Sequence, residues 1–219
     1  MATLTDLVEA VARVEGMDTA TVALFARTVR EAGLIRTAGR GLSAAQMKFV
    51  DAANLLIAVN ASMSVREAPT TVRIFRALRC SYHTNSDAEL PDLRRDKYGW
   101  VSLREIRLGH ALEQLLQSVS ERASLARFLS VPLTQTISRD FAKSKVKLQI
   151  AFNKPIPLVR IDIYEQEQEL ADPPAFGFFF TTREDLSSPP SLKRYPQDRN
   201  ETTQIGYRTV RAIADCLRS

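Results

Sequence analysis

The spacing of apolar residues changes once along this chain, and the change sets the class of fold. Between Leu4 and Val14 apolar side chains recur every three or four residues, which places them on one side of a helix. Between Val146 and Phe152 they alternate with polar side chains, which is the period of a half-buried strand. The sequence therefore predicts an α+β protein, with helices in its first part and a small antiparallel sheet in its last part.

The first sixty residues predict two short helices joined by a tight turn. Gly16 is typical of the end of a helix, and Asp18 is a favourable cap for the next helix, which ends at Gly33. The stretch 43–46 has the spacing of a capping box and predicts the start of a third, largely buried helix. We therefore expect residues 1–65 to form a helix-turn-helix region.

Two further regions follow. The middle region, residues 66–130, predicts a short basic helix at 70–80, an exposed loop at 81–99 and a long amphipathic helix after a second capping box at 102–105. The apolar stripe of that helix, from Leu108 to Val119, either packs on its own domain or forms a dimer seam. The last region, residues 131–219, predicts a β-β-β-α module that consists of strands near 146–152, 159–164 and 176–181, a Pro-rich loop, and a closing helix from Tyr207 to Leu217.

The charge of the chain favours an anionic partner. Lys and Arg together number 30 against 25 Asp and Glu, which gives a formal net charge of +5. Most of the basic residues are arginines, whose planar guanidinium can bind phosphate or the edge of guanine with two hydrogen bonds. The excess is concentrated between residues 27 and 48, where Glu31 is the single acid. Such a cluster is typical of proteins that bind DNA, because affinity depends on the number of phosphates that are neutralised.

The same stretch predicts a recognition helix. In a helix-turn-helix the second helix enters the major groove, and basic or hydroxyl side chains reach phosphates and base edges. We expect the helix at 19–32 to take this role, with bases contacted by Thr21, Arg27 and Thr28 and the DNA backbone held by Arg30, Arg36 and Arg40. The full set of predicted DNA-binding residues is Thr19, Thr21, Arg27, Thr28, Arg30, Arg36, Arg40 and Lys48.

The stretch ATVALFARTVREAGLIRTAGRGLS, residues 20–43, resembles the MerR-type winged helix-turn-helix. When Gly33-Leu34 is matched to the Gly-Leu pair of that family, Arg27 falls at the Arg of its recognition helix. The resemblance implies that Arg36 or Arg40 contacts phosphate from a basic wing. More loosely, REAGLIRTAGRGLSAAQM followed by DAANLLIAV is similar to uncharacterised proteins of proteobacterial prophages.

These features together predict a DNA-binding transcriptional regulator related to phage, which we expect to act on double-stranded DNA as a homodimer. One alternative is a phage-encoded interaction factor, an adaptor or inhibitor of a host machine such as RNA polymerase. Its partner would bind the C-terminal module or the stripe from Leu108 to Val119. A second alternative is a subunit that packages phage DNA as an oligomeric ring.

We do not expect an enzyme, a cofactor or a metal. The sequence contains no phosphate-cradling glycine loop and no nucleophile elbow. Cys80 and His83 supply two ligands where a structural zinc site has four. Asp162 and the acids at 165–167 are predicted to be solvated residues near a strand end rather than magnesium ligands. No catalytic residue is therefore assigned.

The chain is expected to be cytoplasmic and without a membrane partner. Its first ten residues carry acids where a secretory signal has bases, and no apolar run approaches the roughly 18 residues that span a bilayer. The sequence has 2 cysteines, too few for a disulfide framework.

Overall fold

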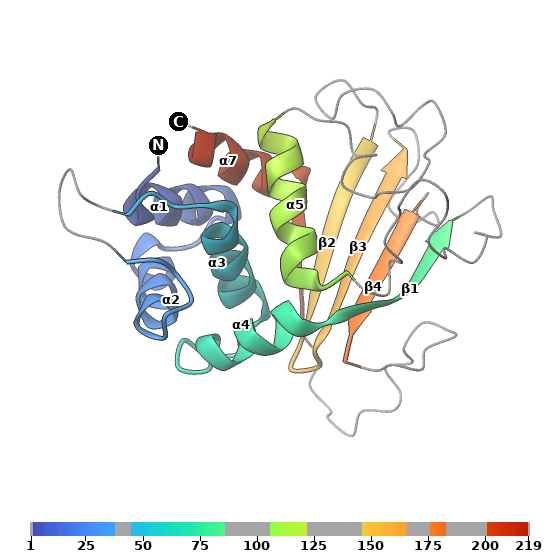
Figure 1. The fold of residues 1–219 in the computed structure, drawn as a ribbon, viewed down its shortest axis with the longest axis horizontal. Coiled ribbons are helices and arrows are strands. Elements are labelled where there is room, and N and C mark those ends of the chain that lie inside the picture. Colours follow the sequence, from blue (N-terminus) through green and yellow to red (C-terminus); the bar gives the residue numbers. More distant parts are fainter. Residues whose placement is uncertain are drawn as a thin grey trace.

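A computed structural model of the chain describes residues 2–37, 45–85, 106–121, 146–165, 176–182 and 201–218 (Figure 1). Its helices are α1 (Leu4–Glu15), α2 (Thr19–Glu31), α3 (Phe49–Ala61), α4 (Ala68–Ala77), α5 (Leu108–Ser120) and α7 (Tyr207–Arg218). Its strands are β1 (Arg79–Asn85), β2 (Val146–Lys154), β3 (Leu158–Glu165), β4 (Phe176–Thr181) and β5 (Glu201–Gly206). The predicted α+β class is confirmed.

Local capping sets the ends of α1 and α2. At the start of α1 the carboxylate of Asp6 accepts the backbone N–H of Thr3 at 2.7 Å, and the chain leaves the helix at Gly16 with φ 68°. At the start of α2 the carboxylate of Asp18 accepts the N–H of Thr21 at 2.9 Å. Gly33 follows α2 with φ 75°, a conformation that costs glycine little. Both helices therefore lie where the sequence predicts them.

The predicted start of the third helix is wrong. α3 begins at Phe49, whereas residues 45–48 form no helix and residues 43–44 lie outside the described ranges. The N–H of Met47 donates to the carbonyl of Ala2 at 2.9 Å, so this segment lies beside the N-terminus of the chain. Asp51 caps the helix instead, because its carboxylate accepts the N–H of Lys48 at 2.8 Å. The prediction that this helix is largely buried is confirmed.

The predicted loop at 81–99 begins with a strand. β1 follows α4 and pairs antiparallel with β4, and residues 86–99 lie outside the described part of the chain. Its partner strand comes from far along the sequence, and β1 has no alternating apolar pattern of its own. α5 likewise begins at Leu108, later than a capping box at 102–105 predicts, and those residues are not described. The backbone N–H of Cys80 donates to the carbonyl of Ile106 at 3.1 Å, so the residue just before Arg107 and α5 lies beside the start of β1.

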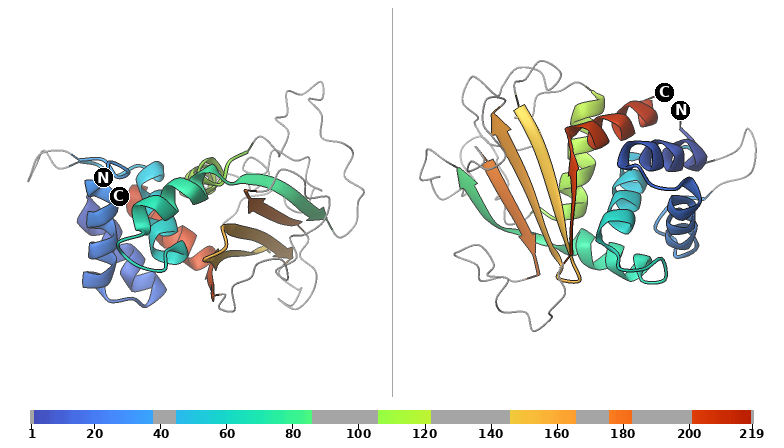
Figure 2. Two further views of the ribbon diagram at one scale, coloured as in Figure 1. Left: turned by 90° about the horizontal axis from the view of Figure 1, so that it is seen from below. Right: turned by 180° about the vertical axis from the view of Figure 1, so that it is seen from behind.

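The strands form one antiparallel sheet in the order β1-β4-β3-β2-β5. The predicted hairpin of β2 and β3 is confirmed. β5 was not predicted, because it lies directly after the expected Pro-rich loop and buries only Ile205 among its side chains. The closing helix α7 is confirmed and packs against α1 and α5 as well as β5 (Figure 2).

A continuous hydrophobic core joins the helices to one face of the sheet. It includes the apolar side of β2 and β3, for example Ile150 and Ile161, together with residues of α1, α3, α5 and α7. The α5 stripe from Leu108 to Val119 is buried in this core, so of its two predicted roles the packing on its own chain is the one observed. The boundaries predicted at residues 65 and 130 remain predictions.

Candidate nucleic-acid interface

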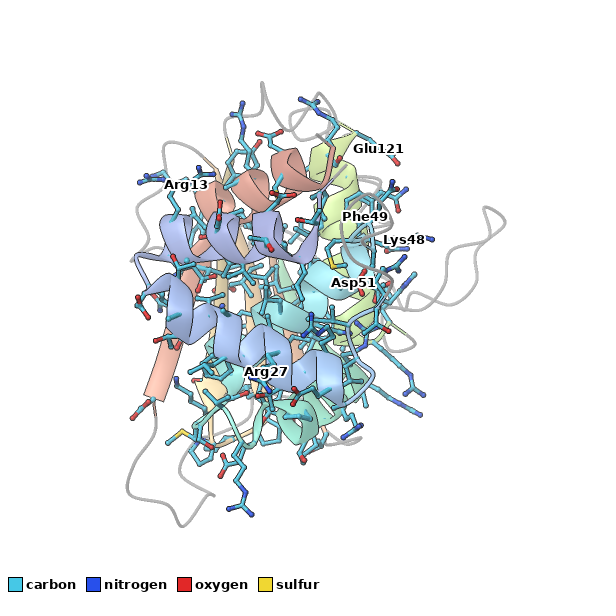
Figure 3. All side chains as sticks on the ribbon, turned by 90° about the vertical axis from the view of Figure 1, so that its left-hand side faces the viewer. Arg13, Arg27, Lys48, Phe49, Asp51 and Glu121 are labelled. Carbon is cyan, nitrogen blue, oxygen red and sulfur yellow. The ribbon has the colours of Figure 1, made fainter. Side chains whose placement is uncertain are left out.

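Helix α2 lies on the surface with one side packed and one side open. Its packed side consists of Val22, Phe25, Ala26 and Val29. Its open side consists of Thr19, Ala20, Ala23, Leu24, Arg27, Arg30 and Glu31. Figure 3 shows Arg27 on the outer side of this helix, at the front of the view. The helix is therefore held rigidly from behind while a row of side chains with two arginines points to solvent.

Arg27 is exposed but not unpaired. Its side chain is 68% accessible, and its Nε donates to Oε1 of Glu31 at 2.7 Å. This hydrogen bond raises the pKa of Arg27, so the guanidinium stays charged. An exposed ion pair between neighbouring turns of a helix is weak and is screened by salt. A phosphate or a base edge can therefore compete with Glu31 for this arginine.

Arg30 is exposed, and the structure shows no hydrogen bond or ion pair between its side chain and another described residue. It lines a shallow groove of about 360 Å³ between α1 and α2. The groove is bounded by Leu4, Thr5, Val8, Glu9, Thr19, Ala23, Ala26, Arg27 and Arg30. The two arginines of α2 thus lie along one edge of the helix, with Thr19 at its first turn.

The two predicted hydroxyl contacts are partly occupied within the helix. Oγ1 of Thr21 lies 3.1 Å from the carboxylate of Asp18, and Oγ1 of Thr28 donates to the carbonyl of Leu24 at 2.9 Å. Both threonines are half-buried. Each hydroxyl already donates its proton within the helix but keeps a lone pair, so in this arrangement it can only accept a further hydrogen bond.

Arg36 is held by a buried carboxylate. Its Nε donates to Oδ2 of Asp51 at 2.5 Å and its backbone N–H donates to Oδ1 at 3.0 Å. The side chain of Asp51 is 3% exposed, so this pair is part of the packing of α3. Lys48 is exposed beside the start of α3 and extends outward past Asp51 in Figure 3. Arg40 lies outside the described residues.

The structure also reveals a basic hollow that the sequence analysis did not assign. It measures about 370 Å³ and is lined by Leu34, Arg73, Arg76, Ala77, Arg107 and His110. Nη2 of Arg73 donates to the carbonyl of Ala32 at 3.3 Å, which places the hollow beside the C-terminal end of α2. The available signal was the spacing of three between Arg73 and Arg76 and between Arg107 and His110, because residues three apart share a side of a helix.

Arg76, which lines this hollow, is held by two side chains. Nη1 donates to Oδ1 of Asn54 at 2.7 Å, and Nη2 donates to Oε1 of Glu113 at 2.5 Å. Nδ2 of Asn54 in turn donates to the carbonyl of Leu34 at 2.5 Å. One guanidinium therefore connects α3, α4 and α5, and Asn54 connects it to the chain that follows α2.

We expect Arg76→Ala to lower the free energy of unfolding by about 1–3 kcal/mol, because the buried Asn54 and the half-buried Glu113 lose their partner. The measurement is urea unfolding followed by circular dichroism. Arg73→Ala is the matched control on the same helix, since Arg73 is exposed and makes one long hydrogen bond. The control should change the stability by less than about 0.5 kcal/mol. If the two substitutions lower the free energy of unfolding equally, the hydrogen bonds of Arg76 to Asn54 and Glu113 do not stabilise the fold as proposed.

Asp162 on β3 differs from the prediction, whereas the side chains of the acids at 165–167 lie outside the described part of the chain. Asp162 is 0% exposed rather than solvated, and Nε of Arg160 lies 2.5 Å from its Oδ2. Burial raises the pKa of Asp162, although Arg160 opposes the change. Within the described ranges no three His, Cys, Asp or Glu side chains are grouped to hold a metal ion. Asp162 is therefore a buried structural acid, paired with an arginine on its own strand.

Comparisons with known proteins give no relative from which a role can be transferred. No family model matches the sequence, and no match is found among curated proteins or solved structures. No helix in the described part of the chain is long and apolar enough to cross a membrane. The resemblance to the MerR-type domain therefore stays an expectation, and any function must be argued from the geometry of α2 and its surroundings.

Proposed function

We propose that this protein binds double-stranded DNA with α1 and α2 as a helix-turn-helix unit and α2 as the recognition helix. The observation that carries the proposal is the open side of α2, which presents Arg27 and Arg30 from a helix whose other side is packed in the core. A rigid helix with exposed basic side chains fits the major groove. The basic hollow beside its C-terminal end extends the positive surface.

The side chains of α2 divide into two roles under this proposal. Arg27 reads a base edge, since its guanidinium is exposed and only weakly held by Glu31. Leu24, which is 53% exposed, supplies an apolar contact of the kind that a thymine methyl group makes. Arg30 and Thr19 contact phosphates at the edges of the groove. Lys48 is a further phosphate contact, whereas the bonds of Arg36 to Asp51 support a structural role.

The test is a duplex titration by fluorescence anisotropy at several salt concentrations. Arg30→Ala should weaken binding to every duplex alike and make the slope of log K against log salt shallower by about 0.9, the contribution of one phosphate. Arg13→Ala is the matched control, because Arg13 is an exposed arginine on α1 and is remote from Arg27 in Figure 3. The proposal fails if wild-type protein does not bind duplex at low salt. It also fails if Arg13→Ala and Arg30→Ala lower the slope equally.

We further infer a regulator, related to phage, that acts as a homodimer. A two-fold dimer would require a palindromic site with half-sites roughly one helical turn apart. Light scattering on the protein and on its duplex complex checks the stoichiometry. If a single protomer binds one half-site with full affinity, the homodimer is contradicted.

One observation favours the alternative of an interaction factor. β1 and β5 are the terminal strands of the described sheet, and a terminal strand can pair with an extended segment of a partner. Such a factor would keep its partner in a pull-down when Arg30 is replaced by alanine. A regulator that works through DNA would lose its effect with the same substitution.

A further inference from the structure

We propose that the basic hollow between α4 and α5 is a binding site for a phosphate group. It is lined by Arg73, Arg107 and His110, which are exposed, and by Arg76, which is half-buried. Among the described residues, Glu113 is the one carboxylate that pairs with these arginines, and its partner is Arg76. The described lining of the hollow therefore carries an excess positive charge that a phosphate would balance.

The donors of the hollow are already oriented. Arg76 is held by Asn54 and Glu113 through Nη1 and Nη2, so its plane is fixed before any ligand arrives. A guanidinium has five N–H donors, and these two bonds leave others for a ligand. Oriented charged donors lose little side-chain entropy on binding, which favours a compact anion with several acceptor oxygens.

The start of α5 contributes to the same space. Arg107 is its capping residue and His110 lies in its first turn, so the positive end of the helix dipole faces the hollow. Gly109 allows this approach, because a Cβ there would lie 2.9 Å from Cζ of Arg76. The missing side chain therefore lets the Arg76 guanidinium lie against the first turn of α5.

His110 adds an imidazole to the lining of the hollow. Its Nε2 lies 2.8 Å from Nε2 of Gln114, one turn further along α5. Only one of its two ring nitrogens is engaged in this contact, so the ring keeps a second polar atom for a ligand. Arginine forks, a helix N-terminus and an imidazole N–H are together the donor set that proteins use for phosphate.

A phosphate can reach this site from two sources, which share their chemistry. One is the backbone of duplex DNA bound on α2, since Arg73 connects the hollow to the end of that helix. The other is a small phosphorylated ligand that binds on its own. The site is proposed for the phosphate group itself, so it does not require the proposed DNA function.

The first arm of the test is a calorimetric titration of the full chain with inorganic phosphate. The double variant Arg73→Gln/Arg107→Gln should bind phosphate at least about tenfold more weakly than wild type, since two charged donors are lost. Its thermal unfolding should stay unchanged, because both side chains are exposed. Arg13→Gln/Arg208→Gln is the matched control; it removes the same charge from exposed positions on α1 and α7 and should bind phosphate like wild type.

The second arm repeats the duplex titration with the same variants. Loss of both phosphate and duplex binding in the Arg73→Gln/Arg107→Gln protein identifies the ligand as a DNA backbone phosphate. Loss of phosphate binding with unchanged duplex binding identifies a small phosphorylated ligand. Wild-type protein that does not bind phosphate, or a double variant that binds it with wild-type affinity, overturns the site. Either result would leave the DNA proposal to be judged by Arg30→Ala alone.

Discussion

Replacing Asp51 by alanine is expected to lower the free energy of unfolding by about 3–5 kcal/mol, the usual cost of removing one partner from a buried ion pair. The carboxylate accepts the backbone N–H and the Nε of Arg36, and it also caps α3 by accepting the N–H of Lys48. Its side chain is 3% exposed, so water cannot easily replace it. Alanine would leave a guanidinium and two backbone donors without an acceptor. Urea unfolding followed by circular dichroism measures the change.

Two variants separate the causes of this loss. Asp51→Asn keeps an oxygen that can still accept from Lys48 but removes the charge opposite Arg36, so its cost should be smaller, about 1–3 kcal/mol. Asp18→Ala removes an exposed helix cap and should cost about 1 kcal/mol. An Asp51→Ala protein no less stable than the Asp18→Ala protein would show that the Arg36 pair contributes nothing beyond capping.

The elements that were predicted correctly are those whose ends are set by nearby residues. α1 and α2 are bounded by Asp6, Asp18, Gly16 and Gly33, all within three residues of the helix end they define. The hairpin of β2 and β3 follows from alternation within one short stretch. In each case the residues that set the element lie within a few positions of it, so a sequence pattern can reveal them.

The elements that were missed depend on residues far apart in the sequence. β1 is a strand because β4 lies beside it, and β5 is one because β2 does. The segment before α3 is extended because Met47 bonds to Ala2. The local pattern shows neither the partner strand nor the N-terminus of the chain. It therefore predicted a loop where β1 lies, too early a start for α3, and no element where β5 lies.

The same limit applies to the candidate site. The outward arginines of α2 could be predicted, because helical periodicity shows which side faces the core. Arg36 was predicted as an open cation, but the carboxylate that holds it lies fifteen residues away, at Asp51. The basic hollow was not predicted, because Arg73 and Arg107 come together only when α4 packs beside α5.

Glu15 gives the fold a pH dependence of known sign. Burial at the end of α1 raises the pKa of its carboxyl group from 4.5 to about 7, although Nδ2 of Asn60 opposes this by donating to both oxygens at 3.1 and 3.2 Å. The folded state therefore binds the proton more tightly than the unfolded state. The contribution of this group to the free energy of unfolding is fully present below about pH 4.5, and it is lost as the pH rises to about 7.

Glu15→Gln should remove this loss. A shift of about 2.5 pH units corresponds to about 3 kcal/mol, so at pH 8 the variant should exceed wild type by an amount of this order, while at pH 4 the two should be nearly equal. The glutamine keeps a side-chain oxygen that can accept from Asn60, so the packing at the end of α1 is retained. Urea unfolding of both proteins between pH 4 and pH 8 gives the difference directly. Glu9→Gln is the control on the exposed side of α1, and its curve should run parallel to wild type. If the Glu15→Gln curve also runs parallel, the carboxyl group of Glu15 is not buried in its charged form, and the end of α1 opens to water as the pH rises.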